Sequence, residues 1–167
     1  MELFRKIFNA LNEERVKYMV AGGVAVNLYG IERATADLDI VVLLEEANLT
    51  KFVSVARKLG LKPKIPVELN DLVDADKRKK WITEKGMRVF SLFDPKNPFF
   101  LIDVFTEFAF DFSAIYGKRK RIRLENTVIP LIPLDALIEM KRGTGRPQDE
   151  SDVFYLERIK RTLGHEK

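Results

Sequence analysis

Residues 20–44 of this chain read VAGGVAVNLYGIERATADLDIVVLL, and this stretch indicates the fold. A short apolar strand, Tyr18 to Ala21, ends at the pair Gly22–Gly23. A helix that starts at Val24 is expected to run to Gly30, and a polar link then leads into a second apolar strand. A strand, a glycine turn, a helix and a further strand predict an α/β unit.

The second strand opens with two carboxylates, Asp37 and Asp39. Side chains alternate along a strand, so residues two apart share a face, and these two carboxylates should point the same way about 7 Å apart. Carboxylates at the mouth of an apolar strand repel each other and lose hydration. We therefore expect a divalent metal ion between them.

The paired glycines fit the same site. Glycine lets the backbone bend sharply and brings N–H groups close to a ligand, and the following helix start adds a positive dipole end, which suits an anion. A phosphate at Gly22 and Gly23 and a metal at Asp37 and Asp39 together describe a nucleoside triphosphate bound as its magnesium complex. Each motif alone has a plain structural alternative, namely a tight turn and a surface strand end.

The order of these motifs carries a family resemblance. A Gly-Gly turn, a helix and then Asp37-Leu38-Asp39-Ile40 resemble the signature of the DNA polymerase beta-type nucleotidyltransferase superfamily. The segment Arg33-Ala34-Thr35 directly before the aspartates is similar to the small stand-alone nucleotidyltransferases related to the AbiE-type toxin of toxin–antitoxin systems. This resemblance implies a third carboxylate on a later strand and a basic helical tail.

A candidate for the third carboxylate is Asp103. It lies in the apolar run 99–105, which should form a hairpin with residues 87–93 across a turn at 94–98. An unpaired carboxylate is costly in such a run, and the structural alternative is a salt bridge to a buried Arg or Lys. The resemblance places the third metal-site aspartate on a hydrophobic strand and so implies Asp103.

The carboxyl-terminal part carries the second half of the resemblance. Lys141 ends one expected helix and Arg146-Pro147-Gln148-Asp149 opens the next, followed by Asp152. In the family a lysine and an Arg-Pro-x-Asp turn at these places face the nucleotide. The structural alternative is a set of exposed charges with the aspartates as caps or partners. The nucleotide-binding positions that the resemblance implies are Gly22, Gly23, Arg33, Thr35, Lys141, Arg146 and Asp149.

Composition excludes several kinds of chemistry. The 167 residues contain no cysteine, which excludes thiol nucleophiles, and the sole histidine, His165, lies among the last three residues, which disfavours a histidine base. No run approaches the ~20 apolar residues of a membrane span, and the early charges do not suit a signal peptide. We expect a single nucleotidyltransferase-like domain over residues 1–167, located in the cytoplasm and without a membrane partner.

Outside the motifs the pattern predicts supporting elements. Helices are expected over residues 2–15 and 48–59, a connection over 61–66, and a polar helix from Val67 that ends near Gly86. Two basic runs, 77–80 and 118–123, suit either nucleic-acid contact or an ordinary solvated surface, and the second also suits a guarded edge strand.

The predicted fold class is α/β (α+β), a small mixed, largely antiparallel sheet backed by helices, as in the nucleotidyltransferase fold. The resemblance implies a metal-dependent transferase that moves a nucleoside monophosphate from an NTP such as ATP to a hydroxyl or phosphate acceptor. Catalytic and metal-binding roles fall to Asp37, Asp39 and Asp103, with two Mg²⁺ ions, or Mn²⁺ in their place. The acceptor stays open and includes tRNA and protein; an antitoxin is an implied partner. Two alternatives remain: a nucleotide- or RNA-binding module without transfer activity, and a phosphohydrolase that uses the same metals.

Overall fold

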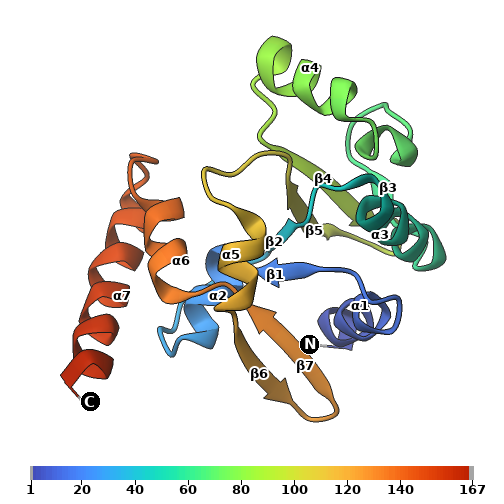
Figure 1. Ribbon diagram of the computed structural model, residues 1–167. Helices are drawn as coiled ribbons and strands as arrows, with labels where there is room; N and C mark the ends of the chain where they lie inside the picture. The colour runs from blue at the N-terminus through green and yellow to red at the C-terminus, as the bar shows by residue number, and fades with distance from the viewer. Residues whose placement is uncertain (1, 166–167) are drawn as a thin grey trace.

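The computed structural model describes residues 2–165, with side chains described for residues 4–163, so the side chain of His165 lies outside the described residues. Within this part of the chain, seven strands form one mixed sheet with helices around it (Figure 1). The strand order is β3-β4-β5-β2-β1-β7-β6. The strands span β1 Tyr18–Val20, β2 Leu38–Val42, β3 Lys62–Pro63, β4 Val89–Asp94, β5 Asn97–Phe105, β6 Lys120–Leu124 and β7 Thr127–Leu131.

Strand directions make the sheet largely antiparallel. The pairs β1–β2, β3–β4, β4–β5 and β6–β7 run antiparallel, whereas β1–β7 and β2–β5 run parallel. The expected hairpin of β4 and β5 is present, and β6, with its Lys and Arg side chains, lies at one edge of the sheet. The predicted fold class is therefore confirmed.

Helices lie around the sheet, in one group at each end of the molecule. In Figure 1, α6 and α7 lie side by side next to α2 and α5, while α1 and α3 lie at the opposite end of the molecule. Between residues 2 and 165 no helix combines the length and apolar character that a membrane span requires. The helices span α1 Glu2–Glu13, α2 Gly22–Leu28, α3 Glu46–Lys58, the 3-10 helix η1 Leu69–Leu72, α4 Ala75–Lys85, α5 Phe112–Gly117, α6 Leu134–Lys141 and α7 Pro147–His165.

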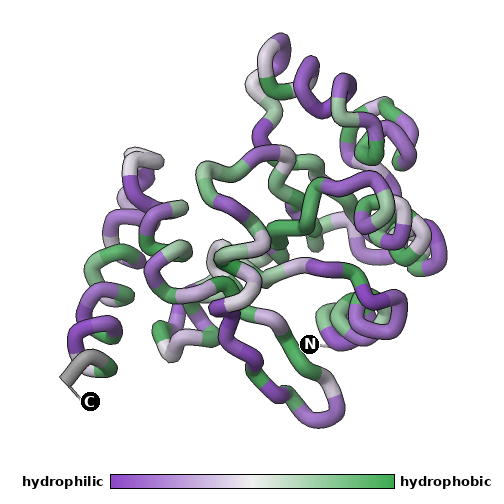
Figure 2. The backbone as a smooth tube through the Cα atoms, viewed as in Figure 1, coloured by the Kyte–Doolittle hydropathy of each residue, from purple (hydrophilic) through white to green (hydrophobic). Residues whose placement is uncertain are grey.

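The core follows the central strands. All residues of β1 are buried, as are four of the five residues of β2, and Figure 2 shows hydrophobic residues along these inner strands. Trp81 of α4 is 6% exposed and stacks on Phe90 with ring centroids 5.2 Å apart. The tryptophan is therefore a packing residue, which anchors an otherwise polar helix to the sheet. The central strands are held firmly on both sides, and this fixes the carboxylates at their ends.

Several predicted boundaries are wrong. The second strand begins at Leu38 and not at Asp37, and the turn expected over 94–98 is shorter, because Asp94 and Asn97 pair as strand residues. The polar helix expected from Val67 is divided into η1 and α4, because the Asp74 side chain accepts hydrogen bonds from the N–H groups of Asp76 and Lys77 and caps a new helix. The connection 61–66 contains the short strand β3, which pairs with β4. The helix expected from Val24 already starts at Gly22.

Candidate functional site

Two aspartates face each other across neighbouring parallel strands. Asp39 on β2 pairs in register with Asp103 on β5, and Asp37 lies one residue before β2 begins. Register partners in a parallel pair point to the same face of the sheet, and residues two apart along a strand do so as well. The fold thus brings the carboxylates of Asp39 and Asp103 together and leaves Asp37 at the entrance of the strand.

The electrostatics of these carboxylates are unfavourable without a cation. Burial and the neighbouring Asp103 raise the pKa of Asp39 to about 6, although a hydrogen bond from the Gly23 N–H and the charge of Lys141 act in the opposite direction. Burial and Asp103 also raise the pKa of Asp37, while Lys64 lowers it. Both shifts have the sign expected for crowded carboxylates that have lost hydration.

Asp103 contributes a further sign of a cation site. Its Oδ1 atom is buried and has no hydrogen-bond partner within the described residues. A carboxylate oxygen in this state is costly unless a cation or a proton satisfies it. Within residues 2–165, no three acidic or histidine side chains form a preassembled metal-ligand set. The structure therefore offers a close pair, Asp39 and Asp103, with Asp37 beside it.

The two glycines are required by close packing against neighbouring side chains of the site. Gly22 has a φ of +58°, and a Cβ atom there would lie 1.8 Å from Oδ2 of Asp39. A Cβ atom on Gly23 would lie 2.5 Å from Oγ1 of Thr35. Only glycine fits at either position without displacing these side chains. Packing against Asp39 and Thr35 therefore requires glycine at both positions, whether or not a phosphate binds there.

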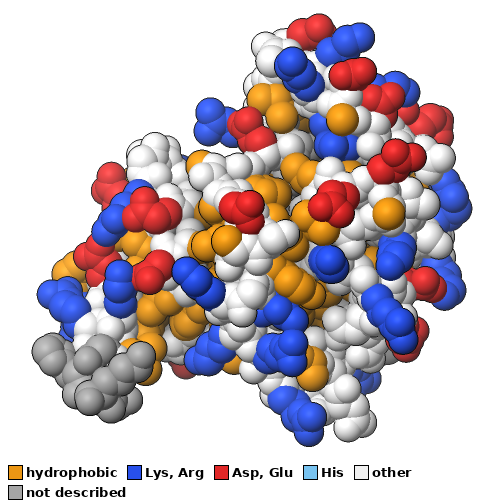
Figure 3. Space-filling view, viewed as in Figure 1, with side chains coloured by type: hydrophobic (Ala, Val, Ile, Leu, Met, Phe, Trp, Pro, Cys, Tyr) orange, Lys and Arg blue, Asp and Glu red, His pale blue; other side chains and the backbone are white. Residues whose placement is uncertain are grey.

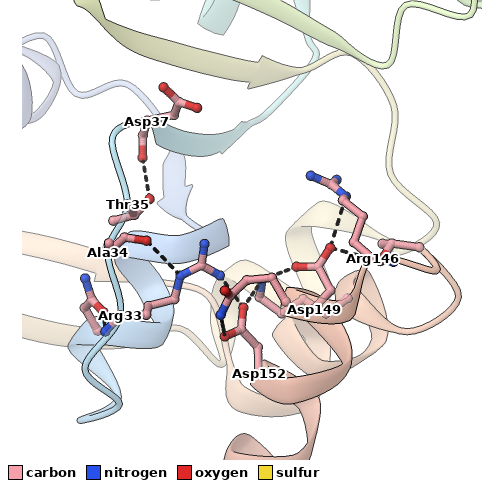
Figure 4. Close-up of polar contacts among 11 residues, drawn as sticks. Arg33, Ala34, Thr35, Asp37, Arg146, Asp149 and Asp152 are labelled. Carbon is pink, nitrogen blue, oxygen red and sulfur yellow. Dashed lines mark hydrogen bonds and ion pairs between the residues drawn. The ribbon is translucent and has the colours of Figure 1, made fainter.

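The link before β2 is shaped by polar contacts. The Arg33 N–H donates to Oδ1 of Asn27 at 3.0 Å, and Oγ1 of Thr35 donates to the backbone oxygen of Asp37 at 3.4 Å. Figure 4 shows Thr35 and Asp37 in this arrangement, with the carboxylate of Asp37 directed away from Thr35. Thr35 thus positions the segment that delivers the first aspartate.

A buried charge network joins this link to the carboxyl-terminal helix. Lys141, at the end of α6, is 7% exposed, and its Nζ atom lies 2.7 Å from both Oδ1 of Asp149 and Oδ2 of Asp152 on α7. Arg33 forms an ion pair with Asp152 (Figure 4). Three segments that are distant in sequence, the link before β2, the end of α6 and the first turns of α7, are therefore held together by one set of charges.

Asp149 is the second carboxylate of this network. Burial alone would raise the pKa of Asp149, but hydrogen bonds from Lys141 and Thr144 and the charges of Lys141 and Arg146 lower it. The Arg146 Nε atom lies 3.2 Å from Oδ2 of Asp149, yet the arginine side chain is 78% exposed. Lys141 is therefore enclosed, whereas Arg146 lies on a solvated turn.

The sequence placed Asp152 in the carboxyl-terminal motif as a candidate cap or partner, and in the structure it is 2% exposed and bridges Arg33 and Lys141. Sequence reasoning missed one residue near the site, Lys64. Lys64 lies close enough to Asp37 to lower its pKa, and no sequence pattern indicated this, because its position depends on the pairing of β3 with β4.

The two basic runs differ in their surroundings. In the run 77–80, Arg78 is buried and donates to the backbone oxygens of Leu72 and Val73, and Lys77 pairs with Asp71. Two residues of this run, Lys77 and Arg78, therefore stabilise the packing of α4 against η1. In the run 118–123, the side chains of Arg121 and Arg123 are exposed on the edge strand β6. The arginines of these runs that are exposed to solvent, Arg121 and Arg123, both lie in the second run.

No protein-family model matches the sequence, and no curated protein matches it at a significant level. Solved structures do match over nearly the whole chain. The lincosamide antibiotic adenylyltransferase LnuA with lincomycin bound has a TM-score of 0.62 at 18% identity, over 95% of this chain and 96% of the other. The structure of ANT(2")-Ia in complex with adenylyl-2"-tobramycin has a TM-score of 0.60 at 14% identity, over 99% and 90%. An antigenic nucleotidyltransferase-like protein from Paracoccidioides brasiliensis has a TM-score of 0.54 at 14% identity, over 95% and 74%. With these neighbours, and with its aspartates on paired strands beside a glycine turn, the chain has the nucleotidyltransferase fold.

Proposed function

We propose that this protein transfers a nucleoside monophosphate from an NTP, ATP included, to a hydroxyl or phosphate group of an acceptor and releases pyrophosphate. The observation that carries the proposal is the register pair of Asp39 and Asp103, with a raised pKa at Asp39 and an unpartnered, buried oxygen at Asp103. Two crowded carboxylates, one of which has a buried oxygen without a partner, are poorly suited to a purely structural role.

The residues present fit a magnesium site by their chemistry. Mg²⁺ prefers carboxylate oxygens and the phosphates of its substrate, and the orphaned Oδ1 of Asp103 and the crowded Asp37 and Asp39 supply such oxygens. Two Mg²⁺ ions, or Mn²⁺ ions, would be held by these three aspartates. When bound, they supply charge neutralisation for the triphosphate and a lowered pKa for the acceptor hydroxyl.

The remaining residues of the site position the NTP and neutralise the charge of its phosphates. The backbone at Gly22 and Gly23, directly beside Asp39, cradles the terminal phosphates of the NTP. Arg33, Lys141 and Arg146 offset the charge of the triphosphate, and the exposed side chain of Arg146 has the greatest freedom to reach it. Thr35 holds the link that places Asp37, and Asp149 holds Lys141 in position.

The acceptor and partners are extensions of this proposal. The two antibiotic-linked structural neighbours support a small organic acceptor and an adenylyl donor. The resemblance to AbiE-type toxins instead supports tRNA or protein as acceptor and an antitoxin as partner. The exposed Arg121 and Arg123 on β6 are the residues through which an RNA acceptor would be held.

The test is a screen of all four α-labelled NTPs with Mg²⁺ against total tRNA, protein extract and small alcohols. The proposal predicts label in one acceptor class together with released pyrophosphate, and loss of both in Asp103→Asn. Retained nucleotide without transfer would identify the binding module. Free labelled nucleotide without labelled acceptor would identify a phosphohydrolase. Glu84→Gln, an exposed carboxylate on α4, is the matched control and should behave as the wild type.

A further inference from the structure

A cavity of about 750 Å³ lies between the end of β5, α5 and α6. Its walls are mainly apolar and aromatic, with Phe105, Phe108, Phe110, Ile115 and Met140 among the lining residues. Phe108 and Phe110 stack with ring centroids 4.9 Å apart and form one wall. Cavities of this size with mainly apolar walls are typical of small-molecule sites.

The cavity begins next to the proposed reaction centre. Phe105 is two residues beyond Asp103 on the same strand and shares its face of the sheet. On the other side, Met140 directly precedes Lys141, whose charge acts on Asp39. One wall of the cavity therefore lies about 7 Å along β5 from Asp103, on the same face of the sheet.

The polar groups of the cavity are mainly acidic, although the chain as a whole carries a net charge of +4. Three carboxylates, Glu107, Asp135 and Glu139, line it against one arginine, Arg88, which pairs with Glu107 at 3.3 Å. Figure 3 shows hydrophobic side chains at the surface on the face that carries α5 and α6, with acidic side chains among them. Among the residues that line the cavity, carboxylates outnumber basic groups, which favours a cationic ligand over an anionic one.

Asp135 and Glu139 also have basic partners, but these partners lie outside the cavity. Lys160 pairs with Asp135 at 2.6 Å, and Arg142 pairs with Glu139. Both basic residues line the neighbouring hollow between α6 and α7, and neither lines this cavity. Asp135 and Glu139 can therefore accept a second cation from the cavity side.

We propose that this cavity binds the acceptor, and that the acceptor is a small organic molecule with an aromatic or aliphatic body, an ammonium group and a hydroxyl group. The body packs against the phenylalanine wall, and the ammonium lies near Asp135 and Glu139. The hydroxyl points toward Asp103. This rests on the proposed transfer: the hydroxyl oxygen forms a bond to the α-phosphorus, the bond to the β-phosphate oxygen breaks, pyrophosphate leaves, and the proton passes to a carboxylate of the site.

Three small molecules that share a 4-hydroxyphenyl group and differ in charge test the cavity without nucleotide or metal. They are the cation tyramine, the neutral tyrosol and the anion 4-hydroxyphenylacetate. Their Kd values are measured by NMR titration of the methyl signals of Ile115 and Met140. We expect tyramine to bind at least ~10-fold more tightly than 4-hydroxyphenylacetate, with tyrosol between them. The double variant Asp135→Asn, Glu139→Gln should bring tyramine to the affinity of tyrosol. Phe110→Ala should weaken all three probes.

Glu150→Gln and Phe154→Ala, both on exposed positions of α7, are matched controls and should leave the three Kd values unchanged. Equal binding of the three probes, or the same charge preference in the double variant, overturns the proposal. So does a dimer in sedimentation experiments whose formation abolishes probe binding, since a second copy of the chain then covers the cavity. Because no NTP is present, this binding test is independent of transfer: label transfer without probe binding refutes the acceptor class alone, and probe binding without transfer refutes the proposed reaction.

Discussion

Replacing Asp39 by asparagine should stabilise the metal-free protein, because the carboxylate is held in an unfavourable place. Burial and the charge of Asp103 raise its pKa to about 6 from the ordinary value of 3.8. The folded protein thus binds the proton more tightly than the unfolded chain does. The cost of the charge is absent below about pH 4, grows between pH 4 and 6, and is complete above pH 6.

The size of the effect follows from the shift. A difference of about two pKa units corresponds to about 3 kcal/mol of unfolding free energy. The substituted asparagine side chain would keep an oxygen that accepts the hydrogen bond from the Gly23 N–H, so little is lost in exchange. For a chain of 167 residues, a gain of this size raises the Tm by about 6 to 12 °C at pH 8.

Urea unfolding of wild type and Asp39→Asn in EDTA at pH 4, 6 and 8 measures this gain. The variant should match the wild type at pH 4 and exceed it by about 3 kcal/mol at pH 8. Saturating Mg²⁺ with an NTP analogue should stabilise the wild type more than the variant. Glu84→Gln, the exposed control, should change the unfolding free energy by less than about 0.5 kcal/mol at each pH. A variant that is less stable than wild type at pH 8, or a gain independent of pH, refutes the reasoning.

Three further substitutions test the surroundings of the carboxylates. Gly23→Val places a side chain where a Cβ atom alone meets Oγ1 of Thr35 at 2.5 Å, so it should displace the link before β2 and abolish NTP binding in calorimetry; a folded variant with wild-type affinity would make the turn purely structural. Lys141→Met leaves two buried aspartates without their shared cation and should lower the unfolding free energy by about 3–5 kcal/mol in urea titrations, whereas a loss below about 1 kcal/mol would show that the pairs are solvated. Arg146→Ala, on an exposed turn, should leave stability within about 0.5 kcal/mol but lower kcat/KM for the NTP; unchanged kinetics would remove Arg146 from the site.

Local patterns allowed the sequence to predict much of the fold. Alternation and turn residues predicted the hairpin of β4 and β5. The hairpin depends on residues that are close in sequence. The placement of Asp39 and Asp103 on neighbouring strands was instead implied by the family resemblance, and the structure pairs the two residues. The roles assigned to the site residues stay predictions.

Contacts between residues that are distant in sequence could not be predicted from the sequence. Arg33 and Asp152 are 119 positions apart, and nothing in either segment indicates that they form an ion pair. The partners of Lys141 were foreseen only as an alternative to nucleotide contact, and its burial followed from the packing of α6 against α7. The cavity and its carboxylates could not be predicted either, because these carboxylates come from the end of β5 and from α6 and are close together only in the folded chain.

The central claim is that Asp37, Asp39 and Asp103 together hold magnesium. Titration calorimetry of Mg²⁺ into the protein with a non-hydrolysable NTP analogue tests it most directly, with the wild type compared with the three single Asp→Asn variants. We predict saturable binding by the wild type and a loss of at least ~10-fold in affinity for each variant, with the fold intact by circular dichroism. Wild-type magnesium affinity in all three variants would contradict the account.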